Sequence, residues 1–420
     1  MIDFGDIERA RERLDDDTVV KRTPVEESTS LGDIVGAHVR LKMEHLQWTG
    51  SFKTRGAYNK ISQVLESSDV DRVVAASAGN HAQGVALAAT KLGVDSTIVM
   101  PRTAPQTKID ATREYGATVE LVGDDFQEAM NYARQRADDP EIEFIHAYDD
   151  PAIVAGQGTL GIEMYDDCPE VDTVIVPIGG GGLIGGIAAA FDELSPETRI
   201  VGVQAKEAAT VPDSINKGIP VTLDSVDTIA DGIATGGISK LTLSLIESHV
   251  DEIVTVSDNQ IAQAILLLLE RAKQLVEGAG AASVAGLLSE EVDVRGETVM
   301  PLLCGGNLDM TMLQTVLTHA LTHREQVLKL RVRIQDMPGR MAEITRVIAD
   351  HDANIHATEH DRADTDLEVG EAFLTFEIET AGSEHSATIV EAIEEQGYDV
   401  EYMNRNAMKN VVMQWGSNSP

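Results

Sequence analysis

The chain has 420 residues, 43% of them hydrophobic, which is typical of a globular protein with two or three domains. Lys and Arg number 33 against 70 Asp and Glu, so the formal net charge is −37. Such a charge repels nucleic acid and anionic lipid, and no apolar run reaches the roughly 18–20 residues that a membrane-spanning helix needs. We therefore expect neither a nucleic-acid partner nor a membrane partner.

Cysteine usage and the first residues bear on the cellular compartment. Cys168 and Cys304 are too few to form a disulfide framework, and the segment from Met1 to Asp6 has neither the basic nor the apolar stretch of a secretory signal. We therefore expect a cytoplasmic protein.

The acidic residues are spread along the chain in short clusters, such as Asp15 to Asp17, and lysine is scarcer than arginine. This pattern favours a halophilic protein, whose acidic side chains keep water bound while salt screens their repulsion. A merely acidic cytosolic protein is the alternative. A halophilic protein is expected to melt at a higher temperature in molar salt than in low salt, and a melting temperature that does not rise would contradict the hypothesis.

From about residue 35 to residue 325, short apolar runs alternate with longer helical patterns. The runs are typical of buried strands at residues 39–43, 73–76, 96–100, 118–122, 173–177, 200–203 and 298–303. Helical patterns lie between them, for example at His81–Leu92 and Asn259–Glu277. The alternation predicts an α/β fold with parallel sheets, whose functional residues lie in loops at the carboxyl ends of the strands.

A different pattern begins near residue 325. Alternating apolar residues predict a strand at residues 328–334, and Pro338–Gly339 then opens a helix. Two strands (354–362 and 371–380), a helix (383–396) and a last strand (398–403) complete a ferredoxin-like β-α-β-β-α-β unit. We expect a first domain over residues 1–325, a second over 326–403, and a tail at 404–420 that has no periodic pattern.

Lys53 stands in a Gly/Ser loop, Thr49-Gly50-Ser51-Phe52-Lys53, ahead of a helical pattern. Such a lysine could simply begin the helix. The functional interpretation is a lysine that forms a covalent bond with a carbonyl compound, for which its amine must be desolvated or lie near a cation.

Two further loops at strand ends are suited to anions. Ser77-Ala78-Gly79-Asn80-His81 precedes a helix whose first N–H groups are unpaired, although an ordinary capped turn is the alternative. Gly179 to Gly182, directly after a strand, are costly for folding unless their backbone N–H groups close around a phosphate. A dinucleotide loop is discounted, because no suitably spaced acidic residue follows it.

Cys304 ends another strand at the same expected edge, followed by Gly305-Gly306-Asn307. It could be a buried small hydrophobic residue, which is the commonest fate of a free cysteine. Opposite a pyridine nitrogen it would instead be a weak, uncharged partner.

These four segments, in this order, resemble the threonine/serine dehydratases of the tryptophan-synthase-β-like (fold type II) pyridoxal-phosphate enzymes. Further matching segments lie at residues 155–159, 230–234 and 277–281. The likeness covers roughly residues 5–325, and the last domain resembles an ACT domain. The resemblance implies a two-subdomain catalytic domain, with a small subdomain inserted at about residues 50–150, followed by an ACT-like regulatory domain.

The resemblance also implies roles for single residues. Lys53 would carry pyridoxal 5′-phosphate and act in catalysis, with Phe52 against the cofactor ring, Asn80 on the ring hydroxyl and Cys304 facing the pyridine nitrogen. The phosphate would be bound by backbone N–H groups of Gly179, Gly180, Gly181, Gly182 and Leu183. The substrate carboxylate would be clamped by Ser77, Ala78, Gly79, Asn80 and His81, and its amino group would face the backbone near Gly232.

The implied reaction is β-elimination of L-threonine to 2-oxobutanoate and ammonia, and of L-serine to pyruvate, by a homo-oligomer expected to be a tetramer. A serine-preferring dehydratase and a serine racemase are alternatives within the family. A non-catalytic amino-acid-binding regulator is an alternative of another class, and it would lack the absorbance band of the bound cofactor.

Two departures from relatives refine these expectations. Family racemases resemble Ser-Ser-Gly-Asn-His in the asparagine loop, where the second serine acts as an acid; here that position is Ala78, whose methyl group cannot deliver a proton. Some relatives bind a divalent cation after the strand that ends here at Val203. Gln204, Ala208 and Thr210 offer no carboxylate for this, so we expect no tight metal site.

In the ACT-like domain, Asp336-Met337-Pro338-Gly339 joins the first strand to the first helix. The resemblance implies that this turn helps to bind an amino-acid effector at the helix N-terminus. Isoleucine or valine is the expected effector, because 2-oxobutanoate feeds isoleucine synthesis. The alternative is a tight turn without a ligand, in a domain that serves only assembly.

Overall fold

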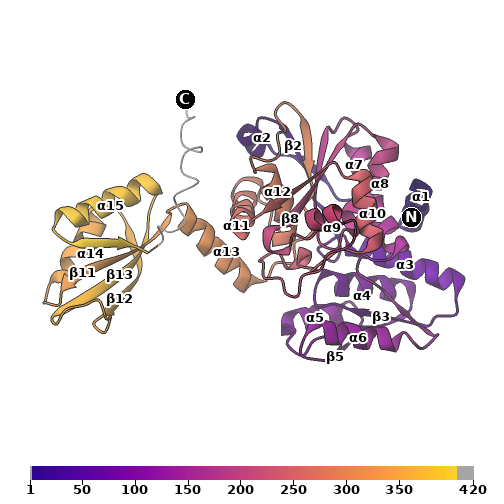
Figure 1. Ribbon diagram of the computed structural model, residues 1–420, viewed down its shortest axis with the longest axis horizontal. Coiled ribbons are helices and arrows are strands. Elements are labelled where there is room, and N and C mark those ends of the chain that lie inside the picture. Colours follow the sequence, from indigo (N-terminus) through magenta and orange to yellow (C-terminus); the bar gives the residue numbers. More distant parts are fainter. Residues whose placement is uncertain (1, 404–420) are drawn as a thin grey trace. The chain divides into compact units, whose positions relative to one another are not determined.

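The computed structural model describes residues 2–403, and the expected tail at 404–420 lies outside them. The chain divides between Asp309 and Met310 into two compact units, each of which is described by itself (Figure 1). No helix within residues 2–403 is both long enough and apolar enough to cross a membrane.

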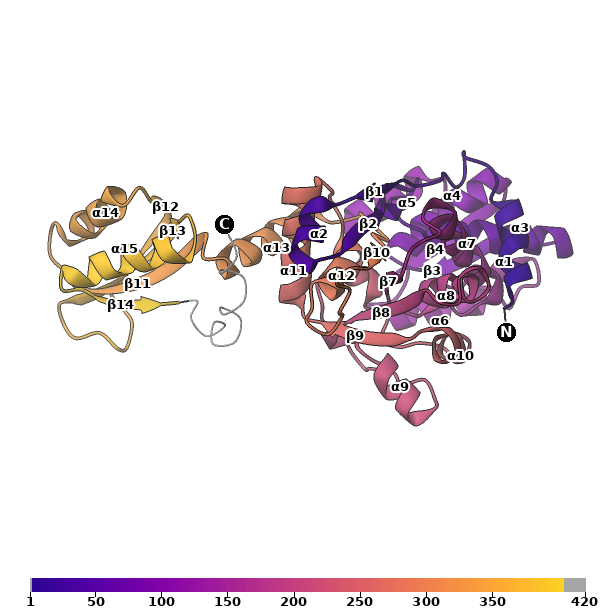
Figure 2. The same cartoon turned by 90° about the horizontal axis from the view of Figure 1, so that it is seen from above.

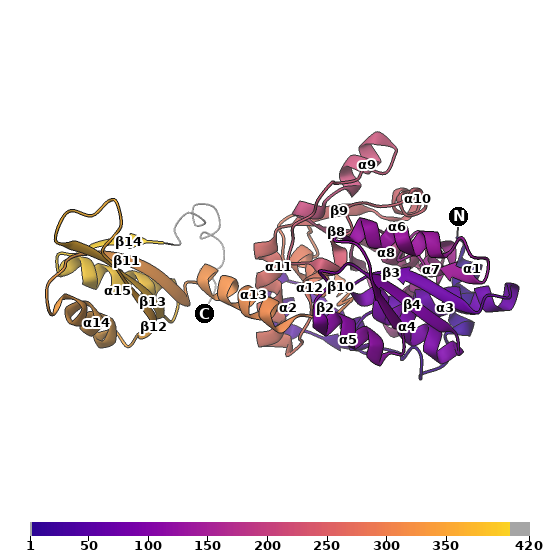
Figure 3. The ribbon, with the colours of Figure 1, turned by 90° about the horizontal axis from the view of Figure 1, so that it is seen from below.

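The first unit contains a small subdomain built on a parallel four-stranded sheet. The strand order is β5-β4-β3-β6, with bounds β3 Arg72–Ala76, β4 Asp95–Met100, β5 Thr118–Leu121 and β6 Ile142–Phe144. Along β3, Val73 and Ala75 share a core with helix α4 (Asn80–Leu92), whereas Val74 and Ala76 share a core with helix α6 (Phe126–Arg136). Figure 3 shows these two helices on opposite sides of the strands. Because successive side chains of a strand point to opposite faces, both faces of this sheet are covered by helices.

A six-stranded sheet forms the centre of the remaining part of the first unit. The strand order is β1-β2-β10-β7-β8-β9, with bounds β1 Val25–Glu27, β2 His38–Lys42, β7 Thr173–Pro177, β8 Arg199–Ala205, β9 Glu252–Val256 and β10 Thr298–Pro301. Only β1 pairs antiparallel within this sheet. All five residues of β7 are buried, as expected for a central parallel strand. The expected α/β fold with parallel sheets is thereby confirmed.

Helices surround both sheets of the first unit. Their bounds are α1 Phe4–Arg13, α2 Thr29–Val35, α3 Lys53–Ser67, α5 Gln106–Glu114, α7 Pro151–Asp167, α8 Gly182–Leu194, α9 Val211–Lys217, α10 Lys240–His249, α11 Asp258–Leu267 and α12 Gly278–Leu287, with 3-10 turns η1 Glu44–Leu46, η2 Lys206–Ala208 and η3 Asp231–Ile233. Helices α1, α3, α7 and α8 pack side by side (Figure 2). Glycines permit the close packing of α3 on α7, because a Cβ on Gly156 would lie 2.6 Å from the Cα of Gly56.

The expected helix at Asn259–Glu277 is wrong in its last part, residues 273–277. Helix α11 ends at Leu267, continues as one π-helical turn (η4 Leu268–Ala272), and stops at Lys273, which has a left-handed φ of 59°. A new helix, α12, then begins directly after Glu277. Apolar periodicity cannot reveal this break, which places Glu277 at the start of a helix instead of at the end of one.

The second unit contains the ferredoxin-like fold. Its antiparallel sheet has the order β12-β13-β11-β14, and the bounds are α13 Met310–His323, β11 Val327–Gln335, α14 Arg340–Asp350, β12 Asn354–Asp361, β13 Glu371–Glu379, α15 Ser383–Glu395 and β14 Asp399–Tyr402. Alternate residues of β11, such as Leu330 and Val332, share a core with Ile344 of α14 and Ile389 of α15. The expected β-α-β-β-α-β order is confirmed.

Candidate active site

A cavity of the first unit lies at the carboxyl ends of β7 and β10 and at the N-terminal ends of α3, α4 and α8. It is lined by Phe52, Lys53, Asn80, Ala147, Tyr148, Gln157, Pro177, Gly179, Gly180, Gly181, Gly182, Leu183, Gly232, Ile233, Thr235, Glu277, Ala279 and Cys304. Lys53, the four glycines, Asn80, Gly232 and Cys304 come from distant parts of the sequence, and the structure brings them to one cavity, at the kind of strand edge where α/β proteins bind ligands.

Lys53 is the first residue of α3, and its half-buried side chain lines the cavity. Burial lowers the pKa of Lys53 to about 8, although Cys304 and Glu277 act in the opposite direction. Its Nζ donates a hydrogen bond to the carbonyl oxygen of Ala147 at 3.1 Å and lies 5.0 Å from the centre of the Phe52 ring. A desolvated amine of this kind is uncharged in an appreciable fraction near neutral pH, so it can act as a nucleophile or a base.

The glycine loop connects β7 to α8 and presents backbone, with no side chains, to the cavity. Gly181 caps α8 with a left-handed φ of 85°, which a residue with a side chain rarely adopts. A Cβ on Gly180 would lie 2.2 Å from the Tyr148 ring, so the loop can lie against this ring only because position 180 lacks a side chain. Backbone N–H groups at the start of α8 are suited to a phosphate, and the loop therefore fits a phosphorylated cofactor.

Substitution of Gly180 with alanine is expected to weaken cofactor binding. The added methyl group must displace the Tyr148 ring or the loop, and overpacking of this kind costs about 1–3 kcal/mol, which corresponds to roughly 5- to 150-fold in affinity. Titration of the cofactor-free protein with pyridoxal 5′-phosphate measures the change. Gly185→Ala is the matched control, because Gly185 lies on α8 just after the loop, outside the cavity lining, and its Cβ would lie 3.1 Å from the Leu245 side chain. Equal affinities of the two variants would contradict the expected role of Gly180.

Asn80, the first residue of α4, is held by two hydrogen bonds. Its Nδ2 donates to Oε1 of Glu277 at 2.6 Å, and its Oδ1 accepts from Nδ2 of Asn307 at 2.8 Å. Burial raises the pKa of Glu277 to about 7, although the hydrogen bond from Asn80 acts in the opposite direction. Glu277 is thus a buried acid, close to Lys53, that can change its charge near neutral pH.

Cys304 follows β10 and lines the same cavity, with 3% of its surface exposed. Burial and the nearby Glu277 raise the pKa of the Cys304 thiol well above its usual range. Cys304 is therefore an uncharged thiol at ordinary pH. An uncharged thiol is what the expected role of Cys304, as a weak partner of a pyridine nitrogen, requires.

The structure does not bring the whole Ser77–His81 loop to the cavity, since Asn80 is the one member of this segment among the lining residues. Ser77 Oγ accepts a hydrogen bond from the backbone N–H of Gly79 at 3.1 Å. The His81 ring is buried, its Nε2 lies 2.9 Å from the carbonyl oxygen of Ile145, and burial lowers its pKa to about 3. His81 therefore fastens α4 to the end of β6 as a neutral ring, and the carboxylate clamp stays a prediction.

Several lining residues are not predicted by the sequence, and Tyr148 and Glu277 are the most informative of them. Tyr148 follows β6, a three-residue strand too short to give a clear pattern. The apolar pattern puts Glu277 at the end of a helix, and the family likeness of residues 277–281 gives it no role. The glycines that follow it indicate a helix start near another backbone, because a Cβ on Gly280 would lie 2.4 Å from the carbonyl oxygen of Gly305.

The segment after β8, where the sequence predicts no tight metal site, is closed by its own hydrogen bonds. Oε1 of Gln204 accepts from the backbone N–H groups of Thr210 and Val211 at 3.1 and 2.9 Å, and its Nε2 donates to the carbonyl oxygen of Ala208 at 3.4 Å. Gln204 thus holds the loop after β8 in place. Within residues 2–403, no group of three His, Cys, Asp or Glu side chains is arranged to hold a metal ion.

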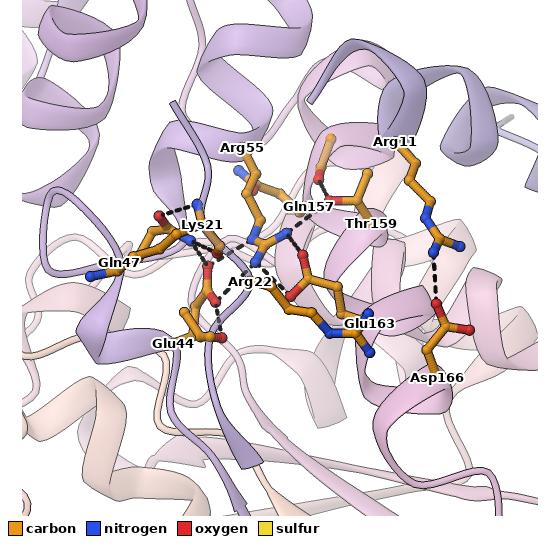
Figure 4. A network of polar contacts seen from close by, with 12 residues as sticks. Arg11, Lys21, Arg22, Glu44, Gln47, Arg55, Gln157, Thr159, Glu163 and Asp166 are labelled. Atoms are coloured by element: carbon orange, nitrogen blue, oxygen red, sulfur yellow. Dashed lines mark hydrogen bonds and ion pairs between the residues drawn. The ribbon is translucent and has the colours of Figure 1, made fainter. Parts of the chain in front are cut away.

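A buried ionic network supports the helix that carries Lys53 (Figure 4). Arg55 of α3 has 1% of its side chain exposed and lies 2.7 Å from a carboxylate oxygen of Glu44 in η1 and 2.7 Å from one of Glu163 in α7. Lys42 of β2, also buried, lies 3.2 Å from Glu163 and 2.9 Å from Asp167. Arg55, two residues beyond Lys53, thus links α3 to η1 and α7, and Glu163 extends the network to β2.

Comparisons with known proteins agree with this site. A family model described as "Pyridoxal-phosphate dependent enzyme" matches residues 17–305, and one described as "ACT domain" matches residues 329–397. An L-threonine ammonia-lyase of Thermotoga maritima is 41% identical over 95% of this chain and 99% of its own length.

Two solved structures are similar to most of this chain. The processed form of threonine deaminase isoform 2 from Solanum lycopersicum is 36% identical, with a TM-score of 0.71, covering 76% of this chain and 87% of that one. A maize serine racemase is 34% identical, also with a TM-score of 0.71, covering 77% of this chain and 99% of that one. The same backbone therefore accommodates both a deaminase and a racemase.

Proposed function

This chain belongs to the pyridoxal-phosphate-dependent enzyme family and has an ACT domain in its C-terminal part, and on that premise we propose that it is a threonine ammonia-lyase. It converts L-threonine to 2-oxobutanoate and ammonia, and L-serine to pyruvate and ammonia. The observation that carries the proposal is the single cavity that unites Lys53 with the glycine loop. A steady-state assay of keto-acid release from L-threonine and from L-serine tests the proposal. If neither amino acid released a keto acid, the proposal would be contradicted.

Residues of the cavity are suited to hold the cofactor. Backbone N–H groups of Gly179–Leu183 would bind its phosphate, Phe52 would lie against its ring, and Asn80 would donate to its ring hydroxyl. When bound at Lys53, pyridoxal phosphate supplies an electron sink for the pair of electrons that a Cα–H bond leaves behind. The uncharged thiol of Cys304 does not enforce a proton on the ring nitrogen as a carboxylate would, which favours prompt loss of the β-group over racemisation.

Lys53 is the base of the proposed reaction. Its pKa, lowered to about 8, leaves an appreciable fraction of the amine uncharged near neutral pH, and the uncharged amine removes the Cα proton of the substrate. The β-hydroxyl group leaves with a proton as water, and the remaining enamine takes up water to give the keto acid and ammonia. The net change is therefore the conversion of threonine to 2-oxobutanoate and ammonia, with no oxidant or reductant.

The alternatives differ in observable ways. A serine racemase needs an acid on the far face of the substrate, and Ala78 offers none at the position where family racemases have serine. A serine-preferring dehydratase would differ from a threonine-preferring one only in its pocket contacts with the methyl group of threonine, which are worth about 1–3 kcal/mol. The ratio of kcat/KM for threonine and serine therefore distinguishes the two enzymes. A non-catalytic regulator would bind amino acids without the absorbance band of the bound cofactor.

We also propose that the ACT domain regulates a cytoplasmic, tetrameric and salt-adapted enzyme of isoleucine synthesis or threonine breakdown. The turn before α14 is ordered by charge: Asp336 lies 2.6 Å from Arg362 and 3.4 Å from His360, and Arg362 is the main cause of its lowered pKa. Gly339 immediately precedes α14, has a φ of 98° and has no side chain, so position 339 presents only backbone at the start of this helix.

Isoleucine or valine at millimolar concentration is expected to change the dependence of rate on threonine concentration. The backbone N–H groups at the start of α14 would bind the carboxylate of the amino acid. Asp336→Asn and Arg362→Gln are expected to weaken the response, because they loosen this turn. Kinetics that do not change with isoleucine, valine or other amino acids would contradict the regulatory role and leave assembly as the function of the domain.

A further inference from the structure

Glu277 is not explained by the proposed chemistry, although it lines the cavity and has only 8% of its surface exposed. It precedes α12, and its side chain makes no cap for that helix. Two glycines make room for its carboxylate, since a Cβ on Gly305 would lie 2.2 Å from Oε1 and a Cβ on Gly232 would lie 3.0 Å from it. A buried acid that is costly for folding and caps nothing calls for another role.

The orientation of the Asn80 amide follows from its neighbours. The carbonyl oxygen of Thr49 can only accept, so the group of Asn307 that lies 2.7 Å from it must be Nδ2. The same Nδ2 lies 2.8 Å from Asn80, which must therefore present its oxygen to Asn307 and its nitrogen to Glu277. With one Nδ2 hydrogen bound to Glu277, the second hydrogen is available to a partner in the cavity.

This chain of bonds joins the two subdomains. Asn80 and α4 belong to the small subdomain, whereas Glu277 and Asn307 follow elements of the six-stranded sheet. A second link lies nearby, where Nζ of Lys108 in α5 is 3.3 Å from a carboxylate oxygen of Asp231 in η3. The charges that act on Glu277 are those of Lys108, Asp231 and Lys53.

We propose that Glu277 is a positioning residue, which holds the Asn80 amide across the boundary between the subdomains and so aims it at the ring hydroxyl of the bound cofactor. The proposal rests on the proposed function, because it requires that pyridoxal phosphate binds in this cavity. An ionised Glu277 accepts a charge-assisted bond, roughly twice as strong as a neutral one, and so holds Asn80 more tightly. Cofactor binding should therefore strengthen as the pH rises through the pKa of Glu277, which is about 7.

The test is a titration of the cofactor-free protein with pyridoxal 5′-phosphate, without substrate, between pH 6 and 8. Glu277→Ala removes the acceptor of Asn80 and is expected to weaken binding by about 10- to 100-fold, as for the loss of a hydrogen bond to a charged group. Glu277→Gln keeps an acceptor oxygen at the same place. It is expected to bind within about threefold of the wild type at pH 6 and to lose the part of the pH dependence that is centred near 7.

Glu193→Gln is the control, since it removes the same charge from an exposed position on α8 and is expected to leave affinity and pH dependence unchanged. Wild-type affinity in Glu277→Ala, or an unchanged pH dependence in Glu277→Gln, would overturn the proposal. If Glu277→Ala does not fold, the pH dependence of Glu277→Gln decides alone. Absence of cofactor binding by the wild type would instead refute the proposed function, so the two failures are distinguishable.

Discussion

Substitution of Lys53 with alanine is expected to abolish turnover of threonine and serine. Lys53 has two parts in the proposed reaction, because it carries the cofactor and removes the Cα proton. The loss of the base alone is expected to lower kcat/KM by at least about 10²–10⁴-fold. The assay is keto-acid release from L-threonine at saturating cofactor.

The control for this prediction is Lys91→Ala, because Lys91 is an exposed lysine on α4 and its loss changes the net charge equally. Its activity should match that of the wild type. Full activity of Lys53→Ala, with the cofactor band intact, would refute the proposed reaction.

Substitution of Arg55 with methionine is expected to destabilise the fold by about 3–5 kcal/mol, since it leaves the buried carboxylate of Glu44 and the half-buried one of Glu163 without their shared partner (Figure 4). Methionine fills similar space, so the loss reflects charge more than packing. Denaturant unfolding measures the difference, provided that both proteins unfold in comparable transitions.

Burial opposes the charged form of Glu163, but Arg55 and Lys42 outweigh burial and lower its pKa below 4.5. A lowered pKa stabilises the fold above the unfolded-state value. The cost of Arg55→Met should therefore be fully present at neutral pH and shrink as the pH falls below about 4.5, through the lowered pKa. An equal cost at all pH values would contradict the electrostatic explanation.

Arg11→Met is the matched control, because Arg11 pairs with Asp166 at 2.7 Å on the surface, with the two side chains 51% and 33% exposed. A pair of this kind is typically worth about 0–1 kcal/mol. If both variants lost the same stability, the buried network would have no special role in supporting α3.

The sequence predicts much of the fold, because its strands are apolar runs bounded by glycine and polar loops. Strands β3, β4, β7 and β8 lie at their expected positions to within one or two residues. Their carboxyl ends are where a parallel sheet collects loops, so the sequence alone is enough to assign Lys53 and Gly179–Gly182 to a site. The break between α11 and α12 could not be predicted, because the apolar residues keep a helical spacing through the segment where the first helix ends and the second begins.

The residues around the site are harder to predict than those in its loops. Arg55 and Glu163 lie 108 positions apart in sequence, and charged residues usually lie on the surface, so nothing in their pattern indicates burial. The indication for Glu277 lies in nearby glycines, at positions 278, 280, 232 and 305. A side chain at any of them would collide with another backbone segment or with the carboxylate of Glu277. Such signals gain meaning only when the contacts between distant segments are known.

Everything proposed for the reaction requires that the amine of Lys53 and the glycine loop hold one phosphorylated aldehyde between them. The most direct measurement is to load the protein with pyridoxal 5′-phosphate, reduce the covalent link with borohydride, and identify the modified residue by mass spectrometry of its peptides. We expect one modified lysine, Lys53, with less modification when Gly180 is alanine. Modification of any other lysine in its place, or none, would contradict this arrangement.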